Sequence, residues 1–259
     1  MTKYEKIGVN YNSFRNADAR ISARLQQLLN LPAGSVIADI GAGTGNYTSA
    51  LAAFGYRMKA VEPAATMRAQ AVANPAIEWL PGYAESVPLP DASVDGVMST
   101  LANHHFRDMA AAAGQMHRIC PDGPVVLFTI DPRRSEAFWF RDYFPAVHER
   151  MFDAFRPVAE LVALLRTSSG RNVEVSGFPL PADLSDLNMH AGWNRPEIYL
   201  NPAIRAGMSG LALADEAEVS SGLQRLQADL ESGLWDARQG DLRQRANLDL
   251  GFVFVKVGG

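Results

Sequence analysis

Residues 36–51 read Val-Ile-Ala-Asp-Ile-Gly-Ala-Gly-Thr-Gly-Asn-Tyr-Thr-Ser-Ala-Leu, a short apolar run that meets three closely spaced glycines. The apolar run predicts a buried strand, and the residues after the glycines are compatible with a helix. Glycine supplies the tight turn between the two and lets a ligand approach the backbone, because it has no Cβ atom. The free N–H groups at the start of the helix then face that ligand. The pattern predicts a loop for a nucleotide-type ligand.

The spacing of the glycines and the next acidic residue narrow the choice of ligand. A dinucleotide loop more often reads Gly-x-Gly-x-x-Gly, whereas the third glycine here arrives one residue early. Glu62 ends the second predicted strand, where a carboxylate can accept both hydroxyls of an adenosine ribose. The pair Asp39-Ile-Gly-Ala-Gly-Thr-Gly45 and Ala60-Val-Glu-Pro63 resembles the first two motifs of class I S-adenosylmethionine (SAM)-dependent methyltransferases. This resemblance implies cofactor contacts from Asp39, Gly41, Ala42, Gly43, Gly45, Glu62, Pro63 and Met67.

Two later segments continue the resemblance in the same order. Residues 80–99 resemble the third and fourth motifs of the family, in which an acidic-small pair edges the adenine, and residues 116–127 resemble the segment before its fifth strand. The resemblance covers residues 30–131, and this part of the chain is similar to the type 11 small-molecule branch of the family. Tyr83 stands where the family usually has Asp, so Glu85 or the Ala84 backbone is expected to carry any polar contact to the adenine. The resemblance implies further cofactor contacts from Ala84, Glu85, Thr100 and Leu101.

Strand-like and helix-like segments alternate along most of the chain. Such alternation predicts an α/β fold with a doubly wound, mostly parallel sheet and helices on both of its faces. The segment 251–257 is a strand with no helix after it, and the resemblance implies that it inserts antiparallel beside the fifth strand of a seven-stranded Rossmann-like sheet. The strands are expected near residues 35–40, 57–62, 77–80, 94–99, 124–130, 172–177 and 251–257.

The chain exceeds a minimal core in two regions. Residues 133–170 form an aromatic-rich helical connection, and residues 178–249 separate the last two strands where a short hairpin would suffice. A loop that long has structure of its own, so a helical cap over the carboxyl edge of the sheet is expected. The aromatic run 138–144 favours packing over a substrate cage. The predicted organisation is an N-terminal lid and helix (1–30), a SAM-binding core (31–177), the cap (178–249) and a terminal strand of the core (250–259).

Four residues outside the motifs are candidates for the site. In similar enzymes an N-terminal Tyr-containing segment folds over bound SAM, which implies contacts from Tyr11 and Arg15; an ordinary amphipathic lid is the alternative. His104 and His105 directly follow the fourth strand, at the edge where α/β sheets bind ligands. A histidine with a pKa near neutrality can take a proton from a nucleophile, so both are catalytic candidates, with a packing or turn role as the alternative.

Composition excludes several classes of protein. A net charge of −4 and the absence of any Lys/Arg run argue against nucleic acid and against a membrane surface as partner. Cys120 is the single cysteine, and the paired histidines have no third ligand at suitable spacing, so no disulfide framework and no metal site are expected. The sequence shows no apolar signal core and no stretch long enough to span a membrane, which predicts a cytoplasmic protein. The oligomeric state stays open.

The sequence thus predicts a SAM-dependent methyltransferase that acts on a small-molecule metabolite by direct in-line displacement and releases S-adenosylhomocysteine. Holding the reactants in line can supply about 7–11 kcal/mol, whereas a base adds about 3–5 kcal/mol. Because positioning dominates, the acceptor and the methylated atom (O, N, C or S) stay open. A SAM-binding protein without methyl transfer, such as a sensor or partner subunit, is one alternative. A nicotinamide-dependent oxidoreductase is another, against which the early third glycine argues.

Overall fold

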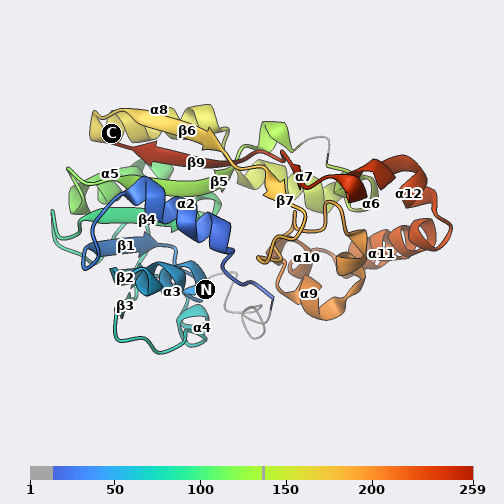
Figure 1. The fold of residues 1–259 in the computed structure, drawn as a ribbon, viewed down its shortest axis with the longest axis horizontal. Coiled ribbons are helices and arrows are strands. Elements are labelled where there is room, and N and C mark those ends of the chain that lie inside the picture. Colours follow the sequence, from blue (N-terminus) through green and yellow to red (C-terminus); the bar gives the residue numbers. More distant parts are fainter. Residues whose placement is uncertain (1–13, 136–137, 259) are drawn as a thin grey trace.

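A seven-stranded mixed sheet forms the centre of the fold (Figure 1). The computed structural model describes residues 14–135 and 138–258. The strand order is β3-β2-β1-β4-β5-β9-β6; β1 to β5 run parallel, and β9 lies antiparallel between β5 and β6. The predicted antiparallel insertion beside the fifth strand is therefore confirmed, and every predicted strand lies within two residues of its place. The strands are β1 (Val36–Ile40), β2 (Arg57–Val61), β3 (Ile77–Leu80), β4 (Gly96–Thr100), β5 (Val125–Ile130), β6 (Val173–Gly177) and β9 (Phe252–Val257).

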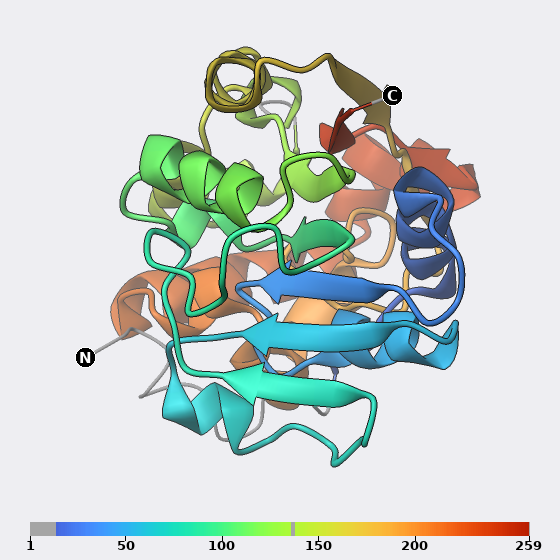
Figure 2. The same cartoon turned by 90° about the vertical axis from the view of Figure 1, so that its left-hand side faces the viewer.

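Helices cover both faces of the sheet (Figure 2). Successive side chains of a strand point to opposite faces, and in β5 this places Val126 and Phe128 in one apolar cluster and Val125 and Leu127 in a second one. The first cluster includes residues of α2 and α3, and the second includes residues of α5 and α8. The helices of this part of the chain are α2 (Ala19–Leu29), α3 (Asn46–Ala53), α4 (Ala65–Arg68), α5 (Met109–Ile119) and α8 (Val158–Ser169).

The helix α2 shows how local sequence sets these elements. Its N-cap Asp18 accepts a hydrogen bond from the Arg20 backbone N–H, which satisfies one of the free donors of the first turn. Apolar residues spaced four apart, from Ile21 to Leu29, are buried against the sheet. Asn30 ends the helix in the left-handed conformation at φ 48°.

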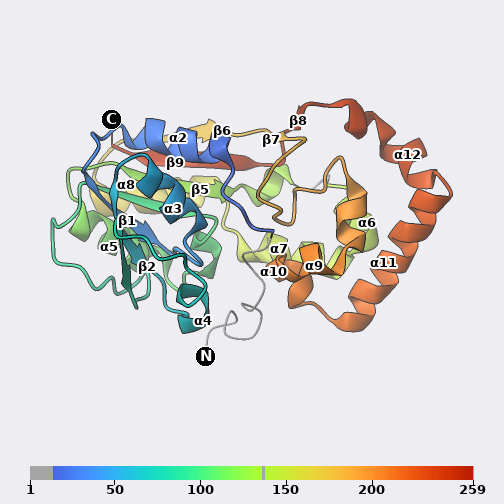
Figure 3. The ribbon, with the colours of Figure 1, turned by 60° about the horizontal axis from the view of Figure 1, so that its bottom comes forward.

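A second group of helices lies beyond the carboxyl ends of the parallel strands (Figures 1 and 3). The segment 178–249 supplies most of them, as predicted from its length, and they pack beside two helices from the connection between β5 and β6. A two-stranded antiparallel pair, β7 and β8, joins the group to the sheet. Among the described helices, none has the length and apolar character needed to cross a membrane. The elements are α6 (Phe140–Tyr143), α7 (Pro145–Ala154), β7 (Leu180–Pro181), α9 (Pro202–Ala206), α10 (Ser209–Ala212), α11 (Glu216–Glu231), α12 (Leu234–Gln239) and β8 (Asn247–Leu248), with the 3-10 turns η2 (Asn103–His105), η3 (Pro132–Arg134), η4 (Pro196–Leu200) and η5 (Gly240–Gln244).

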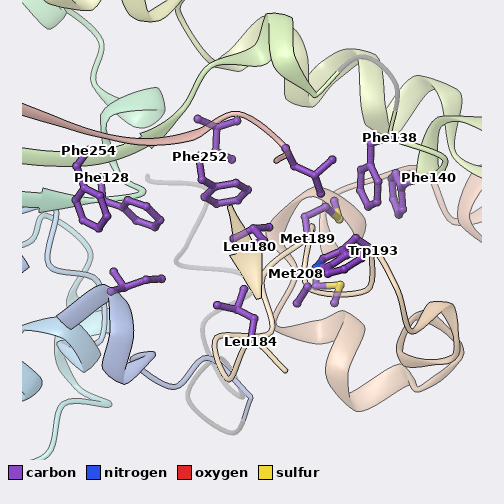
Figure 4. Packing of buried hydrophobic residues seen from close by; sticks show 14 of the residues in the cluster. Phe128, Phe138, Phe140, Leu180, Leu184, Met189, Trp193, Met208, Phe252 and Phe254 are labelled. Atoms are coloured by element: carbon purple, nitrogen blue, oxygen red, sulfur yellow. The ribbon is translucent and has the colours of Figure 1, made fainter. Parts of the chain in front are cut away.

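Aromatic side chains join this helical group to the sheet. Phe138, Trp139, Phe140, Tyr143 and Phe144 are all buried, which confirms the packing interpretation of the run 138–144. The indole N–H of Trp139 donates to the Trp193 carbonyl at 2.8 Å, and its ring meets that of Trp235 edge-on at 5.3 Å. Figure 4 shows the apolar cluster running from Phe128 and Phe252 in the sheet to Trp193 and Phe138 in the helical group.

Candidate functional site

A cavity of about 420 Å³ opens at the carboxyl ends of β1, β2 and β4. Its volume lies in the range of small-molecule sites, and its position is the one at which open α/β sheets bind ligands. Gly45 does not line the cavity, and Tyr11 lies outside the described residues. The cavity brings together the other predicted site residues: Arg15, Asp39, Gly41, Ala42, Gly43, Glu62, Pro63, Met67, Ala84, Glu85, Thr100, Leu101, His104 and His105.

The glycine loop forms one wall of the cavity. The backbone N–H groups of Gly41 and Ala42 donate to the Val61 carbonyl at 2.9 and 3.1 Å, which docks the loop on the end of β2. Gly41 has φ +78°, and a Cβ atom there would lie 2.6 Å from the Ala102 side chain. Gly45 is needed for packing, because a Cβ atom there would lie 2.7 Å from the Trp79 ring. The third glycine thus permits close packing where α3 begins.

Glu62 is fixed by the loop that it faces. Its two carboxylate oxygens accept the backbone N–H groups of Gly43 at 3.0 Å and Ala64 at 2.9 Å. The side chain is buried; burial raises the pKa of the carboxyl, and the two backbone donors oppose that rise. The carboxylate is therefore held in one position between the glycine loop and the start of α4.

Asp39 lies beneath the loop in a dry environment. One carboxylate oxygen accepts the Thr48 hydroxyl at 2.6 Å, and the other, Oδ1, has no partner in the described part of the chain. Burial raises the pKa of this carboxyl to about 7, and the nearby charge of Glu62 acts in the same direction. The buried hydroxyl of Thr100 likewise finds no partner among the described residues. Unpartnered acceptors among the lining residues suit a ligand that carries N–H and O–H donors.

An ion pair from distant parts of the chain closes one side of the cavity. The guanidinium Nε of Arg15 donates to Asp186 Oδ1 at 2.5 Å, and the Tyr47 hydroxyl donates to Asp186 Oδ2 at 3.3 Å. All three residues line the cavity, and Asp186 is buried. The sequence analysis did not find Asp186 or Tyr47. Asp186 lies 171 residues from Arg15, in the segment between β7 and η4, and no motif marks it.

His104 stands in the turn η2, directly after β4. Its ring lies between those of His105, with centroids 3.7 Å apart, and Phe155, at 4.2 Å. Burial holds the pKa of His104 well below its ordinary value, with a further contribution from His105 and Arg15. Its Nδ1 atom is buried and has no partner within the described ranges. The ring is therefore neutral at physiological pH and a weaker base than a free imidazole, unlike the histidine with a pKa near neutrality that the sequence suggested.

Tyr83 and Arg107 form another side of the cavity. The Arg107 guanidinium carbon lies 5.2 Å from the centre of the Tyr83 ring, in a cation–π contact, and Tyr83 is 45% exposed. Glu85 lines the same region, but its Oε1 accepts the backbone N–H groups of Arg107 at 2.5 Å and Asp108 at 3.2 Å. Tyr83, which stands where the family usually has Asp, thus packs against Arg107. The sequence patterns did not reveal Arg107 as a residue of the cavity.

No metal centre is evident among the residues that the structure describes. Within residues 14–135 and 138–258, no group of three or more His, Cys, Asp and Glu side chains lies close enough to hold an ion.

Comparison with known proteins agrees with this geometry. A family described as a methyltransferase domain matches residues 38–128. A solved structure matches with 46% sequence identity and a TM-score of 0.93, and the match covers 96% of this chain and 100% of that one. This chain therefore belongs to the class I SAM-dependent methyltransferases. The solved structure is that of a putative methyltransferase from an antibiotic biosynthesis pathway of Anabaena variabilis.

Curated relatives match over shorter segments. Malonyl-(acyl-carrier protein) O-methyltransferase of Yersinia pestis is 34% identical over 130 residues, 49% of this chain and 48% of that protein. The ubiquinone/menaquinone biosynthesis C-methyltransferase UbiE of Rubrivivax gelatinosus is 31% identical over 115 residues, 43% of this chain and 45% of that protein. The chain thus spans about half the length of the curated relatives that it matches.

Proposed function

We propose that this chain binds SAM in the cavity and transfers its methyl group to a small-molecule acceptor. The observation that carries the proposal is the position of Glu62, a buried carboxylate fastened to the glycine loop. A carboxylate in this place can accept both hydroxyls of a ribose. The lining around it is ionic at Asp39, Arg15 and Asp186, which suits a zwitterionic amino acid. It is aromatic at Tyr83, which suits a purine base.

The residues of the chain hold and orient the reactants. When SAM is bound, its sulfonium supplies the methyl group. Glu62 accepts the ribose hydroxyls, and Asp39 in its ionised form accepts an ammonium group. His104 lines the cavity and is our candidate to take a proton from an acceptor that loses one, although its lowered pKa makes it a weak base. His105 lines the cavity beside it, and the contact between their rings helps to orient His104.

Calorimetric titration with S-adenosylhomocysteine tests the cofactor. We expect micromolar binding to the wild-type protein and no comparable binding of NAD. Two charge-assisted hydrogen bonds are worth about 1.5–3 kcal/mol each, so Glu62→Ala should weaken binding by roughly 100-fold after allowance for non-additivity. Glu62→Gln keeps the shape and removes the charge, and it should bind with intermediate affinity. Equal affinities of the wild-type protein and Glu62→Ala for S-adenosylhomocysteine would contradict the proposal.

Release of S-adenosylhomocysteine from labelled SAM tests the reaction. The relatives act on malonyl-(acyl-carrier protein) or belong to quinone and antibiotic biosynthesis by their names, so acyl thioesters with a free carboxylate, phenols and quinols form the first panel. We expect turnover of at least one of these classes. Tight binding of SAM without turnover across a broad metabolite panel would favour the alternative of a SAM-binding protein that transfers no methyl group.

A further inference from the structure

We infer that the cavity recognises the adenine of its cofactor by stacking and shape and leaves the 6-position of the base open to solvent, so that cofactors carrying a substituent on the 6-amino group bind as well as SAM. The inference rests on the proposed function and concerns the side of the cavity formed by Tyr83 and Arg107.

The fixed groups of the cavity leave one place for the base. Glu62, bonded to the Gly43 N–H, marks the ribose. The buried Asp39 and the Arg15–Asp186 ion pair suit the charged amino-acid part of the cofactor. The rest of the lining includes residues 82–85 after β3 and residues between 100 and 107 after β4, and Tyr83 and Arg107 pack together where these two segments meet. An adenine attached to the ribose therefore lies between these two short segments.

Backbone N–H groups fix the carboxylates of this region in place. An adenine amino group is a donor and needs an acceptor if the protein is to select it. Glu85 Oε1 already accepts two backbone N–H groups, from Arg107 and Asp108. Asp108 Oδ1 accepts two more, from Ala110 at 2.9 Å and Ala111 at 3.0 Å, as the N-cap of α5. These bonds hold the loop and the helix start together and fix both carboxylates as parts of the cavity wall.

The remaining pair, Tyr83 and Arg107, offers a surface for stacking, and the Tyr83 hydroxyl is the acceptor that the variant Tyr83→Phe tests. A guanidinium has only donors, and here it lies over the face of the Tyr83 ring. Both side chains are exposed, Tyr83 to 45%. An aromatic ring and a cation can stack on a purine whatever its 6-substituent is. Their exposure leaves the substituent a path to solvent.

Titration of the full chain with three ligands tests the inference. The ligands are S-adenosylhomocysteine, its 6-desamino analogue, in which ring N1 remains an acceptor, and its N6-benzyl analogue. We expect the dissociation constants of both analogues to lie within about 3-fold of the parent, whereas a site built around the amino group rejects a ligand lacking it by several orders of magnitude. A loss above about 30-fold for the desamino analogue would overturn recognition by stacking. The same loss for the benzyl analogue would overturn the open edge. Failure of the parent itself to bind would instead refute the proposed function.

Two variants of Tyr83 locate the base. Tyr83→Asp adds an acceptor, so it should favour the parent over the desamino analogue by at least about 10-fold. Tyr83→Phe, the matched control, keeps the ring and should leave that ratio at its wild-type value. An unchanged ratio in Tyr83→Asp would show that the base lies elsewhere and would overturn the inference. A drop in the affinity of Tyr83→Phe for the parent alone would show that the hydroxyl reads the amino group, and it would likewise overturn recognition by stacking.

Discussion

At the scale of single residues, the ionised form of Asp39 opposes stability, and in the proposed function it binds a cationic group of the cofactor. Its pKa is raised from 3.8 to about 7 by burial, so the folded state prefers the protonated carboxyl. The stabilising contribution of this preference is present at low pH. It is lost as the pH rises from about 4 through 7, because the ionised group is then buried without a counter-charge. In the proposed function, a cationic group of the ligand supplies the partner that Asp39 Oδ1 lacks among the described residues.

Replacement of Asp39 by Asn separates these two effects. The amide keeps an acceptor for the Thr48 hydroxyl and removes the charge. We expect the free energy of unfolding of the free protein to rise by about 2–4 kcal/mol at pH 8 and the gain to shrink as the pH falls toward 4. Affinity for S-adenosylhomocysteine should fall by about 10–100-fold. Urea unfolding at the two pH values and calorimetry provide the measurements, and a variant less stable than wild type at pH 8 would refute the account.

His190 makes the fold sensitive to acid. Its ring is stacked against Phe138 and meets Phe252 edge-on, with centroids 5.1 Å away in both cases. Burial lowers the pKa of His190 from 6.5 to about 3, and the nearby His148 acts in the same direction. The neutral ring therefore stabilises the fold fully above pH 6.5, and this contribution is lost as the pH falls from 6.5 toward 3.

The loss of stability in acid that His190 causes can be calculated from the shift in its pKa. Between pH 8 and pH 5 the wild-type protein should lose about 2 kcal/mol of unfolding free energy through His190 alone. His190→Gln, which does not titrate, should lose correspondingly less over the same interval, whatever its stability at pH 8. Urea unfolding at both pH values gives the comparison. Equal losses in the two proteins would show that His190 is not the responsible group.

At the scale of elements, the first turn of α2 is joined to the chain that precedes the second helical group. Asp18 caps α2 and also accepts the backbone N–H of Ser185 at 3.1 Å and the Ser185 hydroxyl at 3.2 Å. Arg20 bonds to Asp18 and, at 2.6 Å, to Asp183. Burial opposes ionisation of Asp18, yet Arg20 and the backbone donors hold its pKa well below the ordinary value.

Two capping aspartates provide a matched test of this junction. Asp18→Ala removes both the cap and the bonds to Ser185, and it should lower the unfolding free energy at pH 7 by about 2–4 kcal/mol. Asp108→Ala removes the cap of α5 and the Asp108 carboxylate and should cost about 1 kcal/mol. Urea unfolding measures both. Equal losses would mean that the contacts to Ser185 contribute nothing.

Elements with a local signature were predictable, and contacts between distant elements were not. The strands were placed because each apolar run is bounded by turn residues, and the glycine loop and Glu62 were read from a fixed local order. Asp186 was missed because its partner Arg15 lies 171 residues away in the chain, so no local spacing relates them. Arg107 was missed because its contact with Tyr83 depends on how the loop after β4 folds back. Both contacts depend on tertiary packing, which no local pattern in the sequence specifies.

At the scale of the whole molecule, the sheet and the second helical group share one apolar cluster. Phe252 of β9 and Phe138 both contact His190, and Trp193 and Trp235 belong to the same cluster. Because buried residues of both parts belong to one apolar cluster, loss of one part removes buried contacts of the other. The division into a core and a cap therefore describes arrangement along the chain, and we propose that the two parts unfold together.

The tryptophans make this proposal measurable. Of the four, Trp139, Trp193 and Trp235 lie in the second helical group and Trp79 lies in β3. Fluorescence therefore reports mainly on that group, and far-ultraviolet circular dichroism reports on the whole chain. We expect the two urea transitions to coincide, and Phe252→Ala to shift both equally through a loss of about 3–5 kcal/mol. A fluorescence transition at lower urea than the dichroism transition would show that the group unfolds by itself.

The position of β9 also bears on how the protein is made. On the ribosome, β6 emerges before β9, the strand to which it is hydrogen-bonded in the described sheet, because β9 lies between β5 and β6. The 74 residues between Gly177 and Phe252 must be synthesised in the meantime, which takes about 4–15 s at ordinary elongation rates. During that interval the nascent chain presents the unpaired edges of β5 and β6, so chaperones have a defined window in which to bind it.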